Sequence, residues 1–263
     1  MESVKVKVSK NKERVGETVL QNCGEVAFIV EYVDSKNITV QFKTTGELVK
    51  TDYRTFVRGN VKSHFTPSVY GVGVKGLEPS RDENGKILDS YMCWKAMLSR
   101  CYSAKFQEKH LTYKGCRVCD DWLYYSNFKN WYNENYYEID NKTSQLDKDV
   151  LIKGNKVYSP ETCIFVPKFI NTLFIKSQKR RGDFPVGVYL NKRDKKYVAQ
   201  LSVFIDGTKS LKNLGCFNTV NEAFKAYKQA KEEYIKEIAD NYKDKIPTEL
   251  YEAMYSYEVS IDD

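Results

Sequence analysis

The hydrophobic pattern of this chain changes its period twice, and that change constrains the fold more than any other feature. Apolar residues alternate with polar ones from Gly16 to Val57, recur at helical spacing between Asp89 and Trp131, and alternate again from Gly187 to Gly215. Alternation predicts half-buried strands, whereas a spacing of three or four residues predicts helices. We therefore expect an α+β protein of several domains, because one core rarely needs more than about 150 residues.

The first alternating segment predicts a small β-barrel or a curled sheet, which we assign to a domain over residues 1–77. Its alternating runs are separated by turn sequences at residues 22–24, 34–37 and 45–47. This is the spacing of successive hairpins.

The middle of the chain predicts a central domain over residues 78–177. We expect a helix from Asp89 to Tyr102, capped by Asp89 or Ser90, and a second helical piece from Trp122 to Trp131. From Leu146 to Ser177 the pattern predicts a strand, a turn, a second strand and a helix.

The second alternating segment lies in a C-terminal domain over residues 178–263. It predicts strands at Gly187–Leu190, Tyr197–Ile205 and Ser210–Gly215, and a helix from Asn221 to Ala239. Thr219 or Asn221 is expected to cap that helix, and Pro247 to open a short last helix ending at Tyr255. The expected architecture is a three-stranded sheet packed on a helix.

Charge is unevenly distributed in this last domain. The net charge of the chain is +7, and residues 176–215 hold ten basic against three acidic residues. From Glu232 to Asp263 the balance reverses, with ten acids and three lysines. A basic stripe beside an acidic tail favours a polyanionic partner.

Localisation follows from two further features. The first residues contain no apolar segment typical of an export signal, and no run of about 18 apolar residues predicts a membrane span. The seven cysteines, an odd number, are expected to be reduced thiols. We therefore expect a cytoplasmic protein with no membrane partner.

The central segment resembles a bacteriophage family of HNH-like proteins. The matching residues are Trp94, Met97, Arg100, Cys101, Tyr102, Val118, Cys119, Trp122, Phe128, Trp131, Leu146, Asp147, Asp149, Gly154, Asn155, Tyr158, Ser159, Pro160, Cys163 and Asn171. The resemblance covers Tyr91 to Phe174 and implies a ββα-metal core of the kind that cuts DNA.

This resemblance implies roles for three residues. Asp147 and Asn171 stand where the family holds its metal, so together they would bind Mg²⁺ against a scissile phosphate. Lys148 occupies the place of the histidine that acts as general base, and a cation there repels the metal. The predicted core is therefore degenerate, and whether it still hydrolyses DNA is left open.

The cysteines allow a second kind of metal site. Cys116 and Cys119 have the spacing of half a zinc motif, and Cys101 with Cys163 could complete it. The alternative is that these thiols pack as small hydrophobic side chains.

The C-terminal segment resembles the DNA-binding domain of plant ethylene-response factors, the apetala-two type. The matching residues are Gly187, Val188, Lys196 to Leu201, Leu214, Gly215, Phe217, Thr219, Glu222, Ala223, Ala226, Tyr227 and Ala230. The resemblance implies a three-stranded sheet lying in the major groove of DNA. The candidate DNA contacts are Tyr189, Asn191, Arg193, Lys195, Lys196, Tyr197, Gln200, Lys209, Lys212 and the linker residues Lys179, Arg180 and Arg181.

Together these features predict a phage or mobile-element protein that binds double-stranded DNA and has weak or no nuclease activity. It would act in the cytoplasm of the host cell. One alternative is a Mg²⁺-dependent homing or nicking endonuclease of the HNH type. A second is an interaction protein that acts on a host defence or transcription factor.

Overall fold

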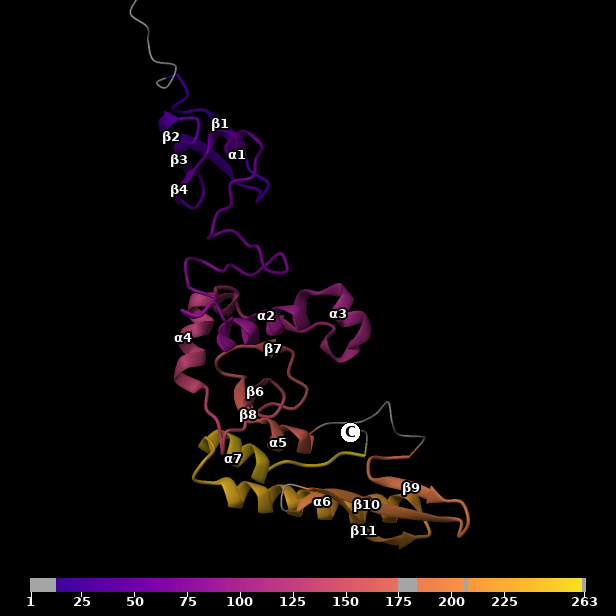
Figure 1. Ribbon diagram of the computed structural model, residues 1–263. Coiled ribbons are helices and arrows are strands. Elements are labelled where there is room, and N and C mark those ends of the chain that lie inside the picture. The colour runs from indigo at the N-terminus through magenta and orange to yellow at the C-terminus, as the bar shows by residue number, and fades with distance from the viewer. Residues whose placement is uncertain (1–12, 175–183, 206–207, 262–263) are drawn as a thin grey trace, which may run out of the picture. The chain divides into compact units, whose positions relative to one another are not determined.

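The computed structural model describes residues 13–174, 184–205 and 208–261. Two compact units are present, one of residues 1–134 with 157–159 and the other of residues 135–156 with 160–263. Each is described by itself (Figure 1). Within the described ranges, none of the helices is both long enough and apolar enough to cross a bilayer. The predicted α+β class is confirmed, whereas the predicted domain boundaries stay predictions.

The first unit begins with a four-stranded antiparallel sheet whose order is β1-β2-β3-β4. Its elements are β1 (Thr18–Leu20), β2 (Val26–Asp34), β3 (Asn37–Phe42), β4 (Leu48–Thr51) and α1 (Tyr53–Val57). The predicted barrel is wrong, because the sheet stays open and β1 does not pair with β4. Both edge strands are short. Phe56 of α1 instead packs into the core formed by Ile29, Val40 and Phe42.

The remainder of the first unit is mostly helical. Its elements are α2 (Asp89–Tyr102), α3 (Ala104–Lys109), η1 (Leu111–Tyr113), β5 (Arg117–Val118), η2 (Asp120–Leu123), α4 (Tyr125–Asn135) and β7 (Val157–Tyr158). The predicted bounds of α2 are confirmed, but its predicted cap is wrong. Leu88 is the N-cap residue, and the Ser90 hydroxyl lies 2.9 Å from the Tyr125 hydroxyl instead. The buried Trp94 donates from Nε1 to the carbonyl oxygen of Trp122 at 2.7 Å.

The second unit opens with two strands and a helix. These are β6 (Ser144–Asp147), β8 (Ile164–Pro167), α5 (Lys168–Asn171) and the 3-10 turn η3 (Thr172–Phe174). Strands β6 and β8 pair antiparallel, and α5 follows β8 directly. The predicted order of strand, turn, strand and helix is confirmed. The last residues of the predicted helix, 175–177, lie outside the described residues.

The three-stranded sheet packed on a helix is also confirmed. Its order is β11-β10-β9, from β9 (Val188–Asn191), β10 (Lys196–Ile205) and β11 (Thr208–Phe217), followed by α6 (Val220–Tyr242) and α7 (Thr248–Tyr255). The Thr219 side chain accepts from the backbone N of Glu222 and completes a capping box, so the predicted cap is correct. Pro247 is the N-cap residue of α7.

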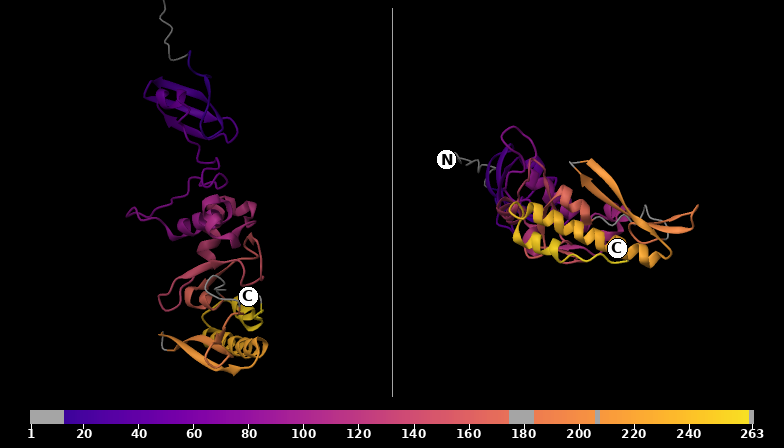
Figure 2. Two further views of the ribbon diagram at one scale, coloured as in Figure 1. Left: turned by 90° about the vertical axis from the view of Figure 1, so that its right-hand side faces the viewer. Right: turned by 90° about the horizontal axis from the view of Figure 1, so that it is seen from below.

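Helix α6 belongs to two cores at once (Figures 1 and 2). Ala223, Phe224 and Tyr227, in its first half, pack on the sheet. Ile235 and Ala239, in its second half, pack with β8, α5 and α7. The side chain of Tyr234 contacts both clusters. The two-strand-and-helix element, which consists of β6, β8 and α5, and the three-stranded sheet therefore pack on the same helix.

Gly187 provides a test of how tightly the sheet packs on α6. It has φ +75°, and an added Cβ would lie 2.0 Å from a ring carbon of Tyr227. Gly154 has a similar φ of +80° but no atom within 4 Å of its would-be Cβ. We predict that Gly187→Ala lowers the free energy of unfolding by about 1–3 kcal/mol more than Gly154→Ala in urea titrations. Equal losses in the two variants would contradict the packing described.

Candidate functional site

The two faces of the C-terminal sheet are chemically different. Ala199, Leu201 and Val203 of β10 pack on α6. Because side chains alternate along a strand, the residues between them lie on the opposite side, which we call the outer face. The cross-strand pairs extend this face to β9 and β11. It consists of Tyr189, Asn191, Lys196, Val198, Gln200, Ser202, Phe204, Lys209, Leu211, Asn213 and Cys216.

A basic turn joins β9 to β10 at one end of this face. The Asn191 side chain accepts from the backbone N of Arg193 at 3.1 Å and fixes the start of the turn. Lys195 adopts φ +52°, the left-handed conformation that reverses the chain. The turn therefore presents four exposed cations, Lys192, Arg193, Lys195 and Lys196. Only Arg193 has an ion-pair partner among the described residues, Asp194, at 3.1 Å.

The structure places the predicted DNA contacts in four groups. Tyr189, Asn191, Lys196, Gln200 and Lys209 lie on the outer face, and Arg193 and Lys195 lie in the basic turn. Tyr197 lies on the side that packs on α6, and Lys212 pairs with Leu201 on that same side. Lys179, Arg180 and Arg181 lie outside the described residues.

Sequence reasoning missed six members of the outer face, which are Val198, Ser202, Phe204, Leu211, Asn213 and Cys216. Phe204 and Leu211 are exposed large apolar residues, and the Ser202 hydroxyl is buried without a hydrogen-bond partner. The signal was present in the alternation of β10. Counting by two from Leu201 and Val203 assigns Ser202 and Phe204 to the outer face.

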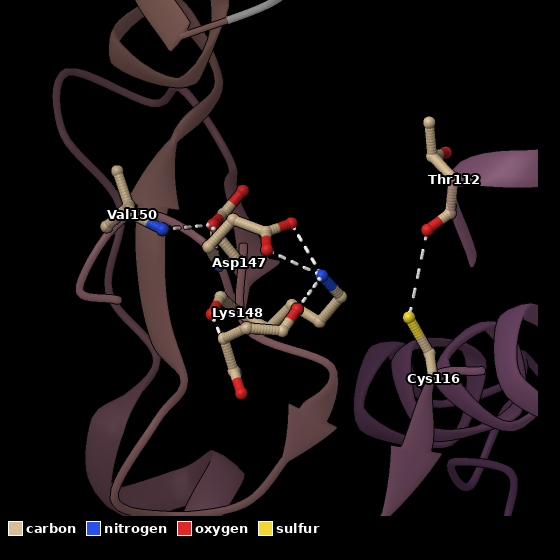
Figure 3. Close-up of polar contacts among 7 residues, drawn as sticks. Thr112, Cys116, Asp147, Lys148 and Val150 are labelled. Carbon is tan, nitrogen blue, oxygen red and sulfur yellow. Dashed lines mark hydrogen bonds and ion pairs between the residues drawn. The ribbon is translucent and has the colours of Figure 1, made fainter. Parts of the chain in front are cut away.

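The second candidate site is the loop after β6, where Lys148 is almost completely buried (Figure 3). Its Nζ donates to both carboxylate oxygens of Asp149, at 2.7 and 2.6 Å, and to the carbonyl oxygen of Asn155 at 2.6 Å. The Asn155 amide returns a bond to the carbonyl oxygen of Lys148 at 2.9 Å. Three acceptors around one nitrogen require an ammonium group, which has no lone pair to accept a proton. Lys148 therefore closes the loop through these bonds.

The surroundings of Asp147 do not fit a catalytic Mg²⁺ site. Its Oδ1 accepts from the backbone N of Asp149 and Val150, at 2.7 and 2.9 Å. Both oxygens of the neighbouring Asp149 are bonded to Lys148. The Asn171 amide donates to Gln145 at 3.1 Å. These groups stabilise the loop and the strand, so we derive no metal-dependent step from them.

The predicted zinc ligands lie in both units. Cys101, Cys116 and Cys119 belong to the first unit and Cys163 to the second. All seven cysteines are thiols, of which Cys101, Cys116 and Cys163 are buried. Within the part of the chain that the structure describes, no three His, Cys, Asp or Glu side chains gather as a metal site would require. The burial of the thiols favours the alternative reading, in which they pack as small hydrophobic groups.

Comparison with known proteins adds no relative. No family model, no curated protein and no solved structure matches the chain. The two family resemblances therefore stay hypotheses, and the interpretation of the outer face and the basic turn rests on their geometry and charge.

The buried ammonium of Lys148 leads to a prediction for stability. Lys148→Met removes the charged donor shared by Asp149 and Asn155, and a hydrogen bond to a charged group contributes about 1.5–3 kcal/mol. We expect that loss in the free energy of unfolding, measured in urea. The matched control is Lys168→Met, which changes an exposed lysine of α5 and should cost less than about 0.5 kcal/mol. If both variants lose the same amount, Lys148 does not hold the loop.

Proposed function

We propose that this protein binds double-stranded DNA through the outer face of β9–β11 and the basic turn. The observation that carries the proposal is the position of the turn. Four exposed cations stand at the end of a sheet face that also presents Tyr189, Asn191 and Gln200. Cations bind phosphates without regard to sequence, and amide side chains beside them read base edges.

The charge of the segment supports this proposal. Residues 184–217 contain six basic residues and two acidic ones, Asp194 and Asp206. Asp194 is bonded to Arg193 and Asn191 within the turn. Among the described residues, the lysines of the turn and Lys209 on β11 have no acidic partner, so they are available for phosphates.

The chemistry of the face fits base recognition in the major groove. A sheet can enter that groove with alternate side chains directed at the bases. Gln200 has the amide group that binds adenine and Lys196 can donate to guanine, whereas the Asn191 amide is bonded within the turn. The opposite side of the sheet is covered by α6, which keeps the strands in register.

We assign the two-strand-and-helix element of β6, β8 and α5 a supporting role. It has the order of an HNH-like core, but the ammonium of Lys148 stands where the base is needed. The proposal is therefore binding without efficient cleavage, by a phage-type protein in the cytoplasm of its host. The rival, a Mg²⁺-dependent nicking enzyme, predicts cutting of a supercoiled plasmid in Mg²⁺.

Salt titrations test the proposal. We predict that the affinity for a short duplex falls steeply with salt, because bound cations release counterions from the phosphates. The variant R193Q/K195Q/K196Q should bind about tenfold or more weakly, and the slope of log affinity against log salt should decrease by about 2.7.

The matched control removes the same charge from α6 and its C-cap residue, on the other side of the sheet. K225Q/K236Q/K243Q changes three exposed lysines and should leave both affinity and slope nearly unchanged. Equal effects of the two triple variants, or no binding at about 50 mM salt, would refute the proposal. Plasmid nicking that requires Mg²⁺ would instead support the rival function, a Mg²⁺-dependent nicking enzyme.

A further inference from the structure

A groove of about 490 Å³ opens at the edge of the C-terminal sheet. Its walls come from η3, β9, β10, β11 and α6. The volume is within the range of small-molecule sites, about 300–1,000 Å³. The polar groups that line it are Thr172, Tyr189, Gln200, Ser202, Lys209, Tyr227 and Lys231.

The groove exists because β9 is much shorter than β10. Pairing with β9 ends at Ala199, and the last backbone bond across this edge runs from the N of Gln200 to the carbonyl oxygen of Gly187 at 2.8 Å. Beyond it, the backbone N of Phe204 donates to the Tyr234 hydroxyl of α6 at 2.9 Å. The edge of β10 between these two bonds faces the groove rather than another strand.

Two cations and a hydroxyl in the groove lack partners. Lys209 and Lys231 make no ion pair or hydrogen bond with the described residues. The Ser202 hydroxyl is buried and has no hydrogen-bond partner among the described residues. No Asp or Glu of the described ranges belongs to the lining. A buried polar group without a partner is costly, so this set favours an anion that accepts hydrogen bonds from all three.

The same groove has an aromatic side. Tyr189 is 47% exposed and Phe204 is 44% exposed, and both belong to the lining. Flat aromatic rings offer stacking surfaces to bases. We propose that the groove binds one nucleotide, with its phosphate at Lys209, Lys231 and Ser202 and its base on the rings of Tyr189 and Phe204.

This proposal goes beyond duplex recognition and does not require it. The nucleotide is either free or part of a single strand, and both present the same phosphate and base. The basic turn is not part of the lining, so the groove and the turn can be changed separately.

The protonation of Lys231 gives the site a pH dependence. Burial lowers the pKa of Lys231 to about 8. Its ammonium is therefore present below that value and is lost as the pH rises through it. The other titratable groups of the lining are Tyr189, Lys209 and Tyr227, which lie on three different elements. The affinity for a phosphate should thus decline between about pH 7 and about pH 9.

Calorimetry with adenosine 5′-monophosphate on the full chain tests the site. We expect binding that is stronger than that of adenosine or of inorganic phosphate alone, and that weakens from about pH 7 to about pH 9, where the phosphate charge is nearly constant. Lys231→Met and Lys231→Gln should each weaken it about tenfold, and Ser202→Ala severalfold. Lys225→Met, an exposed lysine of α6 outside the lining, is the control and should bind normally.

Competition with a single-stranded oligonucleotide identifies the natural ligand. If the oligonucleotide displaces the monophosphate, the groove binds a nucleotide within a single strand; if it does not, the groove binds a free nucleotide. Absence of binding at about 1 mM, equal binding of adenosine, or equal losses in Lys231→Met and Lys225→Met would overturn the proposal. R193Q/K195Q/K196Q separates the two proposals. Suppose that this variant binds adenosine 5′-monophosphate normally and that the unaltered protein does not bind duplex DNA. In that case only the duplex proposal fails.

Discussion

The packing of α6 is the interaction on which the rest of the second unit depends. This single helix of 23 residues packs on one face of the three-stranded sheet. It also forms one side of the core that contains β8, α5 and α7. Tyr234 contacts both cores and binds the backbone of β10 through its hydroxyl. Because the two elements share one helix, neither can shift without disturbing the packing of the other.

This arrangement explains why the outer face is suited to binding. The sheet is supported from behind by Ala223, Phe224 and Tyr227, so the exposed side chains of β9–β11 stand on a fixed backbone. A binding surface gains affinity when its groups are held in place before the ligand arrives. The short β9 strand has a second consequence, since it leaves the edge of β10 open and creates the groove that contains Lys231.

Much of the fold could be predicted from period and capping, but less of the site. The bounds of α2 and the capping of α6 by Thr219 follow from local sequence, and the structure agrees. Whether the N-terminal sheet closes into a barrel could not be predicted, because closure depends on the lengths of the edge strands and on α1, which alternation does not report. The burial of Lys148 depends on a contact with Asn155, which is seven residues away. The face of the sheet on which Tyr197 lies depends on which strand residues pack on α6.

The most direct test of the central claim is a lysine-labelling footprint with and without duplex DNA, read by mass spectrometry. The proposed interface predicts that DNA protects Lys195, Lys196 and Lys209 from acetylation, while Lys225 and Lys236, on α6, react as before. Protection of the α6 lysines with no change at the other three would contradict binding through the outer face.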